Sequence, residues 1–333
     1  MCSRIFWSGN GVADVAARTL DWAEPDNPQL WVLPRGLQRT GEAAGTEGGR
    51  EVSGPEATPS AIREGPLAWT SRYGSLSVTG FETVTTEALN EAGLAVHVLY
   101  LEETAYEAGT DERPTVANAC WAQWLADTCA TVEEAVEAMD GVRITSAEVR
   151  GQHLGAHLAL EDSSGDSAIV EILDGRMVVH HGREHRVMTN DPDYDRQLEN
   201  LALYRPFGGD RSPPGDILST DRFVRASYFL HHLPSPATVE EAVAGAVLVS
   251  RNVWVPPGAP YDDFSVYPTW WGSAVDVTNR VYYFQAVSSP NLIWVGLDEL
   301  DLDEGAPILS LDPFQPGMVG EVAGAFVPTA RSS

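Results

Sequence analysis

The sequence contains no lysine and has far fewer basic than acidic side chains. All 21 basic residues are arginines, against 48 aspartates and glutamates, which gives a formal net charge of −27. Nucleic-acid binding requires a basic stripe along the phosphate backbone, and no stretch of this chain builds one. The same charge repels anionic membrane surfaces. We therefore expect neither nucleic acid nor a membrane as partner, and we interpret the acidity as a source of solubility.

Long hydrophobic runs are also missing. No run reaches the roughly 18 apolar residues that a membrane-spanning helix needs. Near the N-terminus, Arg4, Asn10 and Asp14 interrupt the apolar core that a signal peptide requires. These absences predict a cytoplasmic protein.

Cysteine is scarce, with 3 in 333 residues, which argues against a disulfide scaffold. Cys120 and Cys129 lie in a helical pattern and at its exit, and we interpret them as small buried residues. Their spacing matches no zinc motif. Only Cys2 has a position that suggests chemistry.

Three histidines, His180, His181 and His185, come closest to a metal-binding pattern. No motif of the HExxH type accompanies them. We interpret this segment as a solvated, histidine-rich loop and predict no metal site.

The order of the expected elements favours an α+β fold. Strands are expected at residues 3–19 (a hairpin turning at 9–11), 30–33, 68–79, 94–101, 281–287 and 292–297, with three more between 157 and 180. Helices are expected near 116–125, from 131 onward, and at 195–204, 223–233 and 239–249, and capping boxes that begin at Thr131 and Thr238 open two of them. Strands, helices and strands thus follow one another without regular β-α alternation, which disfavours a doubly wound sheet.

The length fits a single domain over residues 1–333. Within it, residues 40–66 are rich in Gly, Glu, Ala and Pro and have almost no large apolar side chain. We interpret this segment as a surface excursion, either a solvated loop or a cap over a pocket.

The chain begins Met1-Cys2, and this start carries the strongest chemical signal. Removal of Met1 would leave a thiol and a free amine on the same residue, which is a nucleophile with its own base. Many proteins begin this way without using the thiol. If Met1 stays in place, the amine is blocked and a non-catalytic binding protein is the alternative.

The neighbouring motifs resemble the choloylglycine hydrolase and penicillin V acylase family of N-terminal-nucleophile hydrolases. Ordered matches are spread over two thirds of the chain, at 2–4 (CSR), 17–22 (ARTLDW), 30–36 (LWVLPRG), 69–75 (WTSRYGS), 90–94 (NEAGL), 188–192 (MTNDP) and 221–223 (DRF). The resemblance implies a four-layer αββα sandwich, an amide hydrolase and often a homotetramer. It implies no metal or organic cofactor.

By this resemblance Cys2 is the nucleophile, and its own amine moves the proton. Arg18 would lie close by and favour the thiolate through its opposite charge. Asp21 would accept a hydrogen bond from the amine. The alternatives are a surface ion pair of Arg18 with Asp14 or Asp21, and a turn or cap role for Asp21.

The resemblance also assigns the donors that stabilise a tetrahedral oxyanion. These are the backbone of Tyr100 and the side chain of Asn190, with Arg222 fixing charge nearby. Tyrosine at position 100 is similar to the penicillin V acylases rather than the bile salt hydrolases. The alternatives are an ordinary turn asparagine at 190 and an ion pair of Arg222 with Asp221.

Trp7 and Trp22 flank these motifs and are candidates for contact with an apolar acyl group, Trp22 before Trp7. We therefore predict a cysteine amidohydrolase that cleaves an amide between an apolar acyl group and a small polar amine, as in penicillin V or acyl homoserine lactones. The alternatives are a bile salt hydrolase and a binding protein on the same scaffold.

Overall fold

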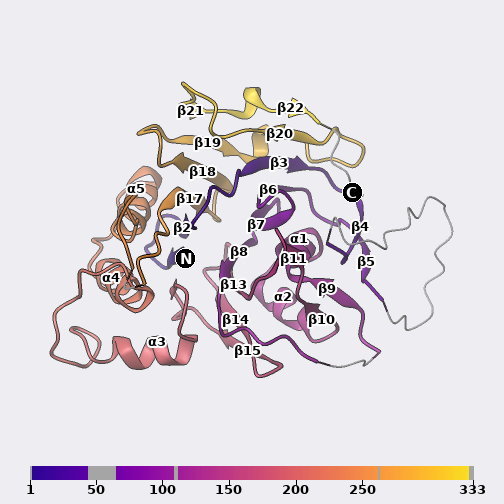
Figure 1. Cartoon of the computed structure of the whole chain (residues 1–333). Coiled ribbons are helices and arrows are strands. Elements are labelled where there is room, and N and C mark those ends of the chain that lie inside the picture. Colours follow the sequence, from indigo (N-terminus) through magenta and orange to yellow (C-terminus); the bar gives the residue numbers. More distant parts are fainter. Residues whose placement is uncertain (1, 44–64, 109–111, 262, 330–333) are drawn as a thin grey trace.

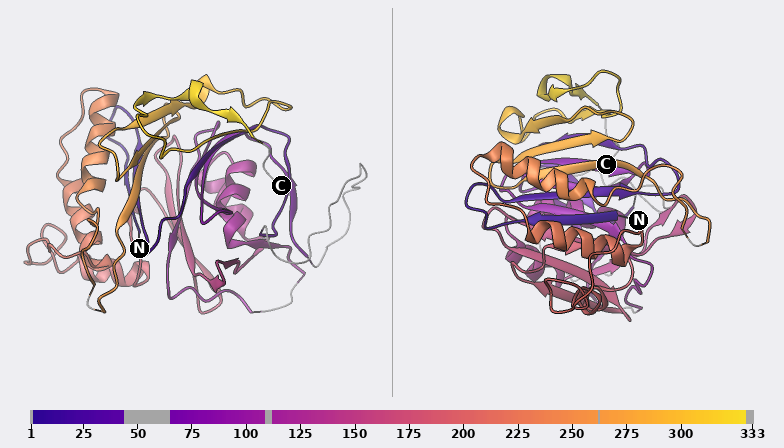
Figure 2. Two further views of the ribbon diagram at one scale, coloured as in Figure 1. Left: turned by 45° about the horizontal axis from the view of Figure 1, so that its top comes forward. Right: turned by 90° about the vertical axis from the view of Figure 1, so that its left-hand side faces the viewer.

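The structure is a computed structural model that describes residues 2–43, 65–108, 112–261 and 263–329. Most of the predicted excursion, residues 44–64, lies outside the described part. Two large sheets are stacked face to face in the middle of the molecule (Figures 1 and 2).

The first sheet has seven strands, and the N-terminal strand is one of its inner members. Its order is β16 (Val187–Met188), β1 (Cys2–Trp7), β2 (Val15–Asp21), β17 (Thr269–Asp276), β18 (Val281–Ala286), β19 (Ile293–Gly296) and β21 (Gly320–Glu321).

The second sheet has nine strands and faces the first. Its order is β15 (Arg176–His181), β14 (Ser167–Leu173), β13 (Ala156–Glu161), β8 (Ala95–Tyr100), β7 (Val84–Asn90), β6 (Ser75–Gly80), β3 (Gln29–Leu33), β20 (Leu309–Leu311) and β22 (Val327–Pro328). Short two-stranded pairs lie outside it: β4 (Gln38–Thr40) with β5 (Ala68–Thr70), β9 (Thr115–Ala117) with β10 (Arg143–Thr145), and β11 (Glu148–Val149) with β12 (Gln152–His153).

Helices cover the outer face of each sheet, as the left view of Figure 2 shows. On the side of β1 lie α3 (Tyr194–Leu201), α4 (Ser219–His231) and α5 (Val239–Arg251); on the other side lie α1 (Asn118–Thr128) and α2 (Val132–Met139). One apolar core fills the space around β1, β2 and β17, and a second lies between the nine-stranded sheet and α1 and α2. The α+β fold predicted from the element order and the αββα sandwich that the family resemblance implies are both confirmed.

The predicted N-terminal hairpin is also confirmed. Strands β1 and β2 pair antiparallel, with Cys2 opposite Leu20. Side chains alternate along β1, so Cys2 faces the second sheet while Ser3 and Trp7 face the helices. The hairpin therefore brings the thiol and the second half of the ARTLDW motif to one end of the sheet.

Both predicted capping boxes are present. The Thr131 hydroxyl accepts from the N–H of Glu134 at 3.1 Å, and the Thr238 hydroxyl accepts from the N–H of Glu241 at 3.2 Å. These contacts satisfy backbone donors in the first turns of α2 and α5.

Two sequence-based expectations are wrong, and two strands were missed. The strand expected at 68–79 is divided into β5 and β6 by a bend, and His180 and His181 lie on β15 rather than in a loop. Strands β7 and β17 were not predicted. Both are central and buried on nearly every residue, and their sequences, VTTEALN and TWWGSAVD, lack the apolar-polar alternation of a half-exposed strand.

A chain of buried charged side chains connects the two sheets. Arg4 on β1 and His97 on β8 both contact the carboxylate of Glu161 on β13, and all three are fully buried. His97 Nδ1 lies 3.1 Å from Oε1 of Glu87, which accepts a hydrogen bond of 2.9 Å from Ser273 on β17. Burial alone would lower the pKa of His97, but Glu161 and Glu87 outweigh it and raise this pKa. Burial would raise the pKa of Glu161, but Arg4 and His97 lower it.

The substitution Glu161→Gln is expected to lower the free energy of unfolding by about 3 kcal/mol, because it leaves buried cations without their counter-charge. The raised pKa of His97 gives stability that is complete below about pH 6.5 and is lost as the pH rises through the folded pKa. The lowered pKa of Glu161 gives stability that is present above about pH 4.3 and is lost as the pH falls. The difference in the free energy of unfolding between Glu161→Gln and wild type should therefore be largest between about pH 4.3 and about pH 6.5.

Urea unfolding at several pH values measures this difference. Glu137→Gln, at an exposed position of α2, is the matched control and should change stability little. A loss for Glu161→Gln that stays constant from pH 4 to 9 would contradict the electrostatic explanation.

Among the described residues, the helices are too short or too polar to cross a membrane.

Candidate active site

Cys2 lies at the start of β1, buried between the two sheets. Its Sγ is 3.7 Å from Nη2 of Arg18. Its backbone nitrogen donates to Oδ1 of Asn190 at 2.5 Å. While Met1 is attached, this nitrogen belongs to a peptide bond, and removal of Met1 would make it an amine. The hairpin thus places thiol, nitrogen and arginine together, as the sequence predicts.

Arg18 is fully buried and held in one orientation. Its Nη1 donates to the carbonyl oxygens of Thr86 at 2.7 Å and Val98 at 3.2 Å. Its guanidinium carbon lies 5.0 Å from the ring centroid of Trp271, close enough for a cation–π interaction. Because the side chain is buried, its interpretation as part of a surface ion pair is wrong. The guanidinium instead carries a fixed positive charge beside the Cys2 sulfur.

Asn190 follows β16 and connects three parts of the site. Its Oδ1 accepts from the nitrogen of Cys2 and, at 3.0 Å, from Nη2 of Arg222. Its Nδ2 donates to the carbonyl oxygen of Tyr100 at 2.6 Å. The Cys2 nitrogen and the Arg222 guanidinium can only donate, and the Tyr100 carbonyl can only accept. These partners determine which atom of the Asn190 amide is oxygen and which is nitrogen. The amide nitrogen therefore points to the end of β8.

Tyr100 ends β8 in the opposite sheet, and its backbone faces the site. The carbonyl of Tyr100 accepts from Asn190, and the carbonyl of Val98, two residues earlier, accepts from Arg18. Because the N–H and C=O of one strand residue point to the same side, the N–H of Tyr100 also points to this edge. The backbone of Tyr100 and the amide of Asn190 are thus close together, as the resemblance implies.

Arg222 on α4 is buried and binds the other side of the nucleophile residue. Its Nη1 donates to the carbonyl oxygen of Cys2 at 2.6 Å and to the hydroxyl of Ser3 at 2.5 Å. The same atom lies 3.7 Å from Oδ2 of Asp21, so its buried ion-pair partner is Asp21 rather than Asp221.

Asp21, at the end of β2, is fully buried behind Cys2. Its Oδ1 accepts from the hydroxyl of Thr269 at 2.7 Å. Burial raises the pKa of Asp21, although Arg222 opposes the shift. The contact predicted between Asp21 and the amine of a processed Cys2 stays a prediction.

Sequence reasoning missed the residues that hold Asn190. The hydroxyl of Ser219 accepts from the Asn190 N–H at 2.9 Å, and Nε2 of Gln197 donates to the Asn190 carbonyl at 3.0 Å. Gln197 lies three residues after Tyr194, on the buried face of α3. A polar residue at a core position of a helix was the available signal for this role.

Tyr261 is another missed residue. Its hydroxyl and Nε of Arg222 both donate to the carbonyl of Ile217, at 3.3 and 2.9 Å. Burial raises the pKa of Tyr261. Its segment, before β17, was not assigned to any element.

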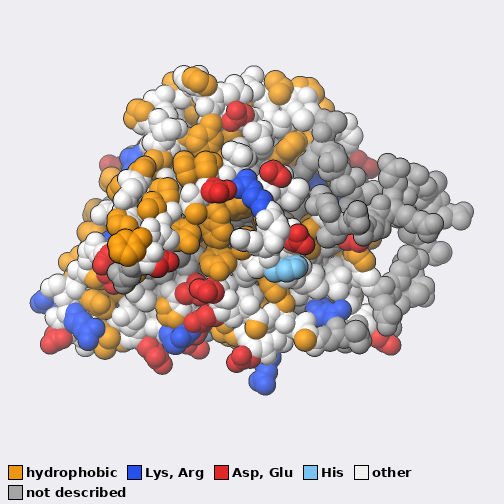
Figure 3. All heavy atoms as spheres, viewed as in Figure 1, with side chains coloured by type: hydrophobic (Ala, Val, Ile, Leu, Met, Phe, Trp, Pro, Cys, Tyr) orange, Lys and Arg blue, Asp and Glu red, His pale blue; other side chains and the backbone are white. Residues whose placement is uncertain are grey.

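An apolar cavity of about 60 Å³ opens beside Cys2 and Arg18. Half-buried Trp22 lines it, as do the end of β8 and the turn before β7. It continues into an outer cleft of about 930 Å³. The face seen in Figure 3 has hydrophobic side chains gathered at its middle, with acidic ones around them. Trp7 is not brought to this cavity, because its ring packs against Gly245 of α5 on the other face of the sheet.

The αββα sandwich, with an inner strand that begins at residue 2, is the architecture of the N-terminal-nucleophile hydrolases. A family model for linear amide C–N hydrolases, choloylglycine hydrolase family, matches residues 2–310, and the chain belongs to this family. It is therefore a hydrolase of linear amide C–N bonds, and the resemblance found in the sequence is confirmed.

Individual relatives agree with this assignment. A penicillin V acylase of Pectobacterium atrosepticum is 34% identical over 94% of this chain and 86% of its own length. The solved structure of a penicillin V acylase from Agrobacterium tumefaciens has a TM-score of 0.83 and 35% identity, covering 99% of this chain and 98% of that one. A bile salt hydrolase/transferase of Bifidobacterium longum subsp. longum is 24% identical over 91% of this chain and 97% of its own length.

Proposed function

We propose that this protein is an N-terminal cysteine amidohydrolase in which removal of Met1 frees Cys2 as the nucleophile. One observation carries the proposal: the sulfur of Cys2 lies 3.7 Å from Arg18 Nη2, Cys2 lines an apolar cavity, and its nitrogen contacts Asn190. Nucleophile, base and donors then come from the chain itself, so the reaction requires no metal or cofactor.

In the first half-reaction, Sγ attacks the amide carbon and the thiol proton passes to the amine of Cys2. The carbonyl oxygen becomes an oxyanion, for which the N–H of Tyr100 and the amide of Asn190 are the proposed donors. Asn190 Nδ2 carries two hydrogens, and its contact with Tyr100 uses one of them.

When the tetrahedral intermediate collapses, its C–N bond breaks and the departing nitrogen takes the proton from the ammonium of Cys2. This leaves an acyl thioester on Sγ. Water then gives its proton to the amine and attacks the thioester, and the acid leaves as the thiol is restored. Asp21 and Arg222 hold the nucleophile residue throughout.

The proposed substrates have an apolar acyl group, as in penicillin V or acyl homoserine lactones. Similarity to two penicillin V acylases supports this group, and so does the mostly apolar lining of the inner cavity. Conjugated bile salts are the second candidate, supported by the Bifidobacterium relative. A homotetramer and a cytoplasmic location, which rest on the resemblance and the composition, complete the proposal.

Intact-mass measurement followed by an amide panel tests the proposal. We expect a mass lower by one methionine residue and release of amine from phenoxyacetyl and hexanoyl amides faster than from cholyl amides. The control is a variant with an extra residue before Cys2, chosen so that the residues before Cys2 are not removed. This variant should bind the amides without cleaving them. A processed protein that binds the amides but leaves every one of them intact would instead support the non-catalytic binder.

A further inference from the structure

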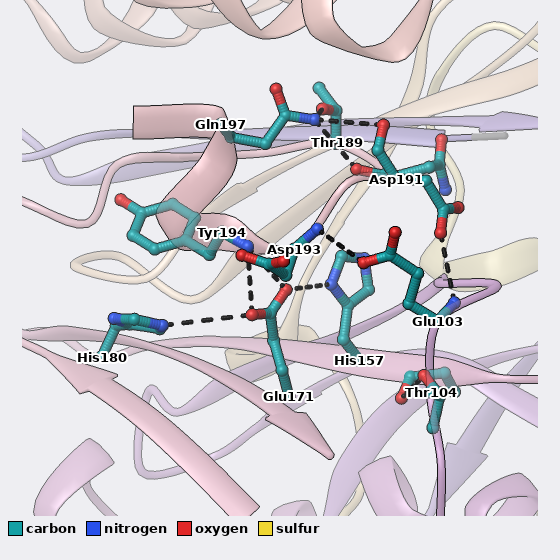
Figure 4. A network of polar contacts seen from close by, with 12 residues as sticks. Glu103, Thr104, His157, Glu171, His180, Thr189, Asp191, Asp193, Tyr194 and Gln197 are labelled. Atoms are coloured by element: carbon teal, nitrogen blue, oxygen red, sulfur yellow. Dashed lines mark hydrogen bonds and ion pairs between the residues drawn. The ribbon is translucent and has the colours of Figure 1, made fainter. Parts of the chain in front are cut away.

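Two groups that contact the nucleophile residue are held in different ways. Asn190 is held by hydrogen bonds, because Gln197, seen in Figure 4, donates to the backbone carbonyl oxygens of Asn190 at 3.0 Å and Asp191 at 3.3 Å. Arg18 donates to backbone carbonyls, none of which carries a full negative charge. Its guanidinium carbon lies over the ring of Trp271, 5.0 Å from the centroid. The position of this ring therefore matters for the position of the guanidinium.

Trp271 is fully buried in β17, where the strand departs from regular pairing. The register between β17 and β2 shifts between Thr269 and Trp271. Such irregularities re-aim side chains and are common next to active sites. The indole also stacks on Phe284, with centroids 5.2 Å apart. Trp271 thus presents its ring to Arg18 from a point where the sheet is adjusted locally.

Asp26, in the loop between β2 and β3, fixes the orientation of this indole. Its two carboxylate oxygens accept from Nε1 of Trp271, at 3.2 and 3.0 Å. The side chain is fully buried against the end of β6, where a Cβ at Gly80 would come within 2.6 Å of Oδ2. The Asp26 carbonyl accepts from the N–H of Phe81 at 2.7 Å, which ties the loop to the second sheet. An indole that is bound at its nitrogen and stacked on its ring cannot rotate freely.

The charges of Asp26 and Arg18 also act on each other. Burial raises the pKa of Asp26 to about 6, although the N–H of Trp271 and the positive charges of Arg18 and Arg150 oppose this rise. Asp26 is therefore mostly a carboxylate at pH 7. It stabilises the arginine in two ways, through the indole that it orients and through its own charge.

We propose that Asp26 and Trp271 are positioning residues that hold the Arg18 guanidinium beside the sulfur of Cys2. Arg18 favours the thiolate through its charge, and this effect depends on the 3.7 Å separation of Nη2 and Sγ. Neither Asp26 nor Trp271 lines the cavity beside Cys2, so both act through Arg18 and not on the substrate. This inference rests on the proposed function and adds the residues that keep its nucleophile reactive.

Asp26→Ala and Trp271→Phe, made in processed protein, test the proposal. Trp271→Phe keeps an aromatic ring but removes the N–H that binds Asp26. Each variant should lower kcat for a hexanoyl amide about threefold to tenfold, with KM within about twofold of wild type. Asp26→Asn keeps an acceptor for the indole and should lose less activity than Asp26→Ala. The other charged side chains near Cys2, Asp21 and Arg222, are unchanged in these variants.

Alkylation of Cys2 by iodoacetamide over a range of pH, followed by mass, separates positioning from a purely structural role. A guanidinium that has moved away favours the thiolate less, so the alkylation profile of Asp26→Ala and Trp271→Phe should move upward by about 0.5 to 1 pH unit. An unchanged profile would assign both residues to stability alone. A profile that moves downward in Asp26→Ala would mean that its charge acts on the sulfur without Arg18. Either result would overturn the proposal.

Two buried residues away from the site provide matched controls. Trp121→Phe makes the same substitution at a fully buried position of α1. Asp162→Ala removes a buried carboxylate that accepts from the N–H of Val132 at 2.8 Å, beyond the end of β13 that lies away from Tyr100. Both controls should keep the wild-type kcat and alkylation profile.

A double-mutant cycle tests the route through Arg18. In an Arg18→Ala background, Asp26→Ala should lower kcat by less than about twofold, because the group that it positions is already gone. The full loss in that background would overturn the proposal. If processed wild type cleaves none of the amides, the proposed function fails, while the alkylation profiles still test whether Asp26 and Trp271 hold Arg18.

Discussion

Replacement of Cys2 by alanine is expected to reduce kcat/KM for amide hydrolysis by about 10⁴-fold or more, the size of effect seen when a covalent nucleophile is removed. The alanine keeps the backbone nitrogen and its contact with Asn190, so only the sulfur is lost. The measurement is product release under single-turnover conditions, with intact mass to detect an acyl-enzyme in wild type and its absence in the variant.

Two cysteines elsewhere in the chain provide the controls. Cys129 is buried beside α1, and Cys120 lies within that helix, both on the outer side of the second sheet. Cys120→Ala and Cys129→Ala should keep activity within about threefold of wild type. Urea unfolding of Cys2→Ala should match wild type, because the site loses one sulfur atom from a small cavity. Wild-type rates in Cys2→Ala would end the nucleophile assignment.

The parts of the fold that the sequence predicted depend on short-range patterns. The turn at residues 9–11 predicted the hairpin, and that hairpin alone brings Arg18 to Cys2. The capping boxes at Thr131 and Thr238 predicted where α2 and α5 begin. Each pattern lies within about twenty residues, so local chemistry was sufficient.

The parts that were missed depend on contacts between distant segments. In β7, Glu87 reads as a surface residue, yet it is fully buried because His97, Ser273 and Tyr282 contact its carboxylate. In β17, a Trp-Trp-Gly sequence gives no alternation because both faces of the strand are covered. Neither burial pattern can be read from the strand alone.

The candidate active site likewise combines residues that a local pattern brings together with residues from distant segments. Cys2, Arg18 and Asp21 share one hairpin, whereas Tyr100, Asn190 and Arg222 come from three other elements. Only the family resemblance pointed to these three, and the geometry supports their grouping. Ser219 and Gln197, which hold Asn190, belong to no motif in the chain.

Replacement of Asn190 by alanine is expected to lower kcat by about 10²- to 10³-fold with a small change in KM, as for the loss of one oxyanion donor. The side chain has a second task, because its Oδ1 accepts from the Cys2 nitrogen. Asn190→Asp separates the two tasks: it keeps an acceptor for Cys2 and Arg222 and removes the donor near Tyr100. If stabilisation of the oxyanion dominates, both variants should lose activity to a similar degree.

Asn252→Ala, at the exposed end of α5, is the matched control and should keep wild-type kcat. Near-wild-type activity in Asn190→Asp combined with a large loss in Asn190→Ala would assign the residue to holding the Cys2 amine instead. That result would leave the N–H of Tyr100 as the donor at the oxyanion. In that case the pH profile of kcat for Asn190→Ala should also shift, because an amine without its acceptor no longer titrates as in wild type. The loss of an oxyanion donor alone would instead lower kcat equally at every pH.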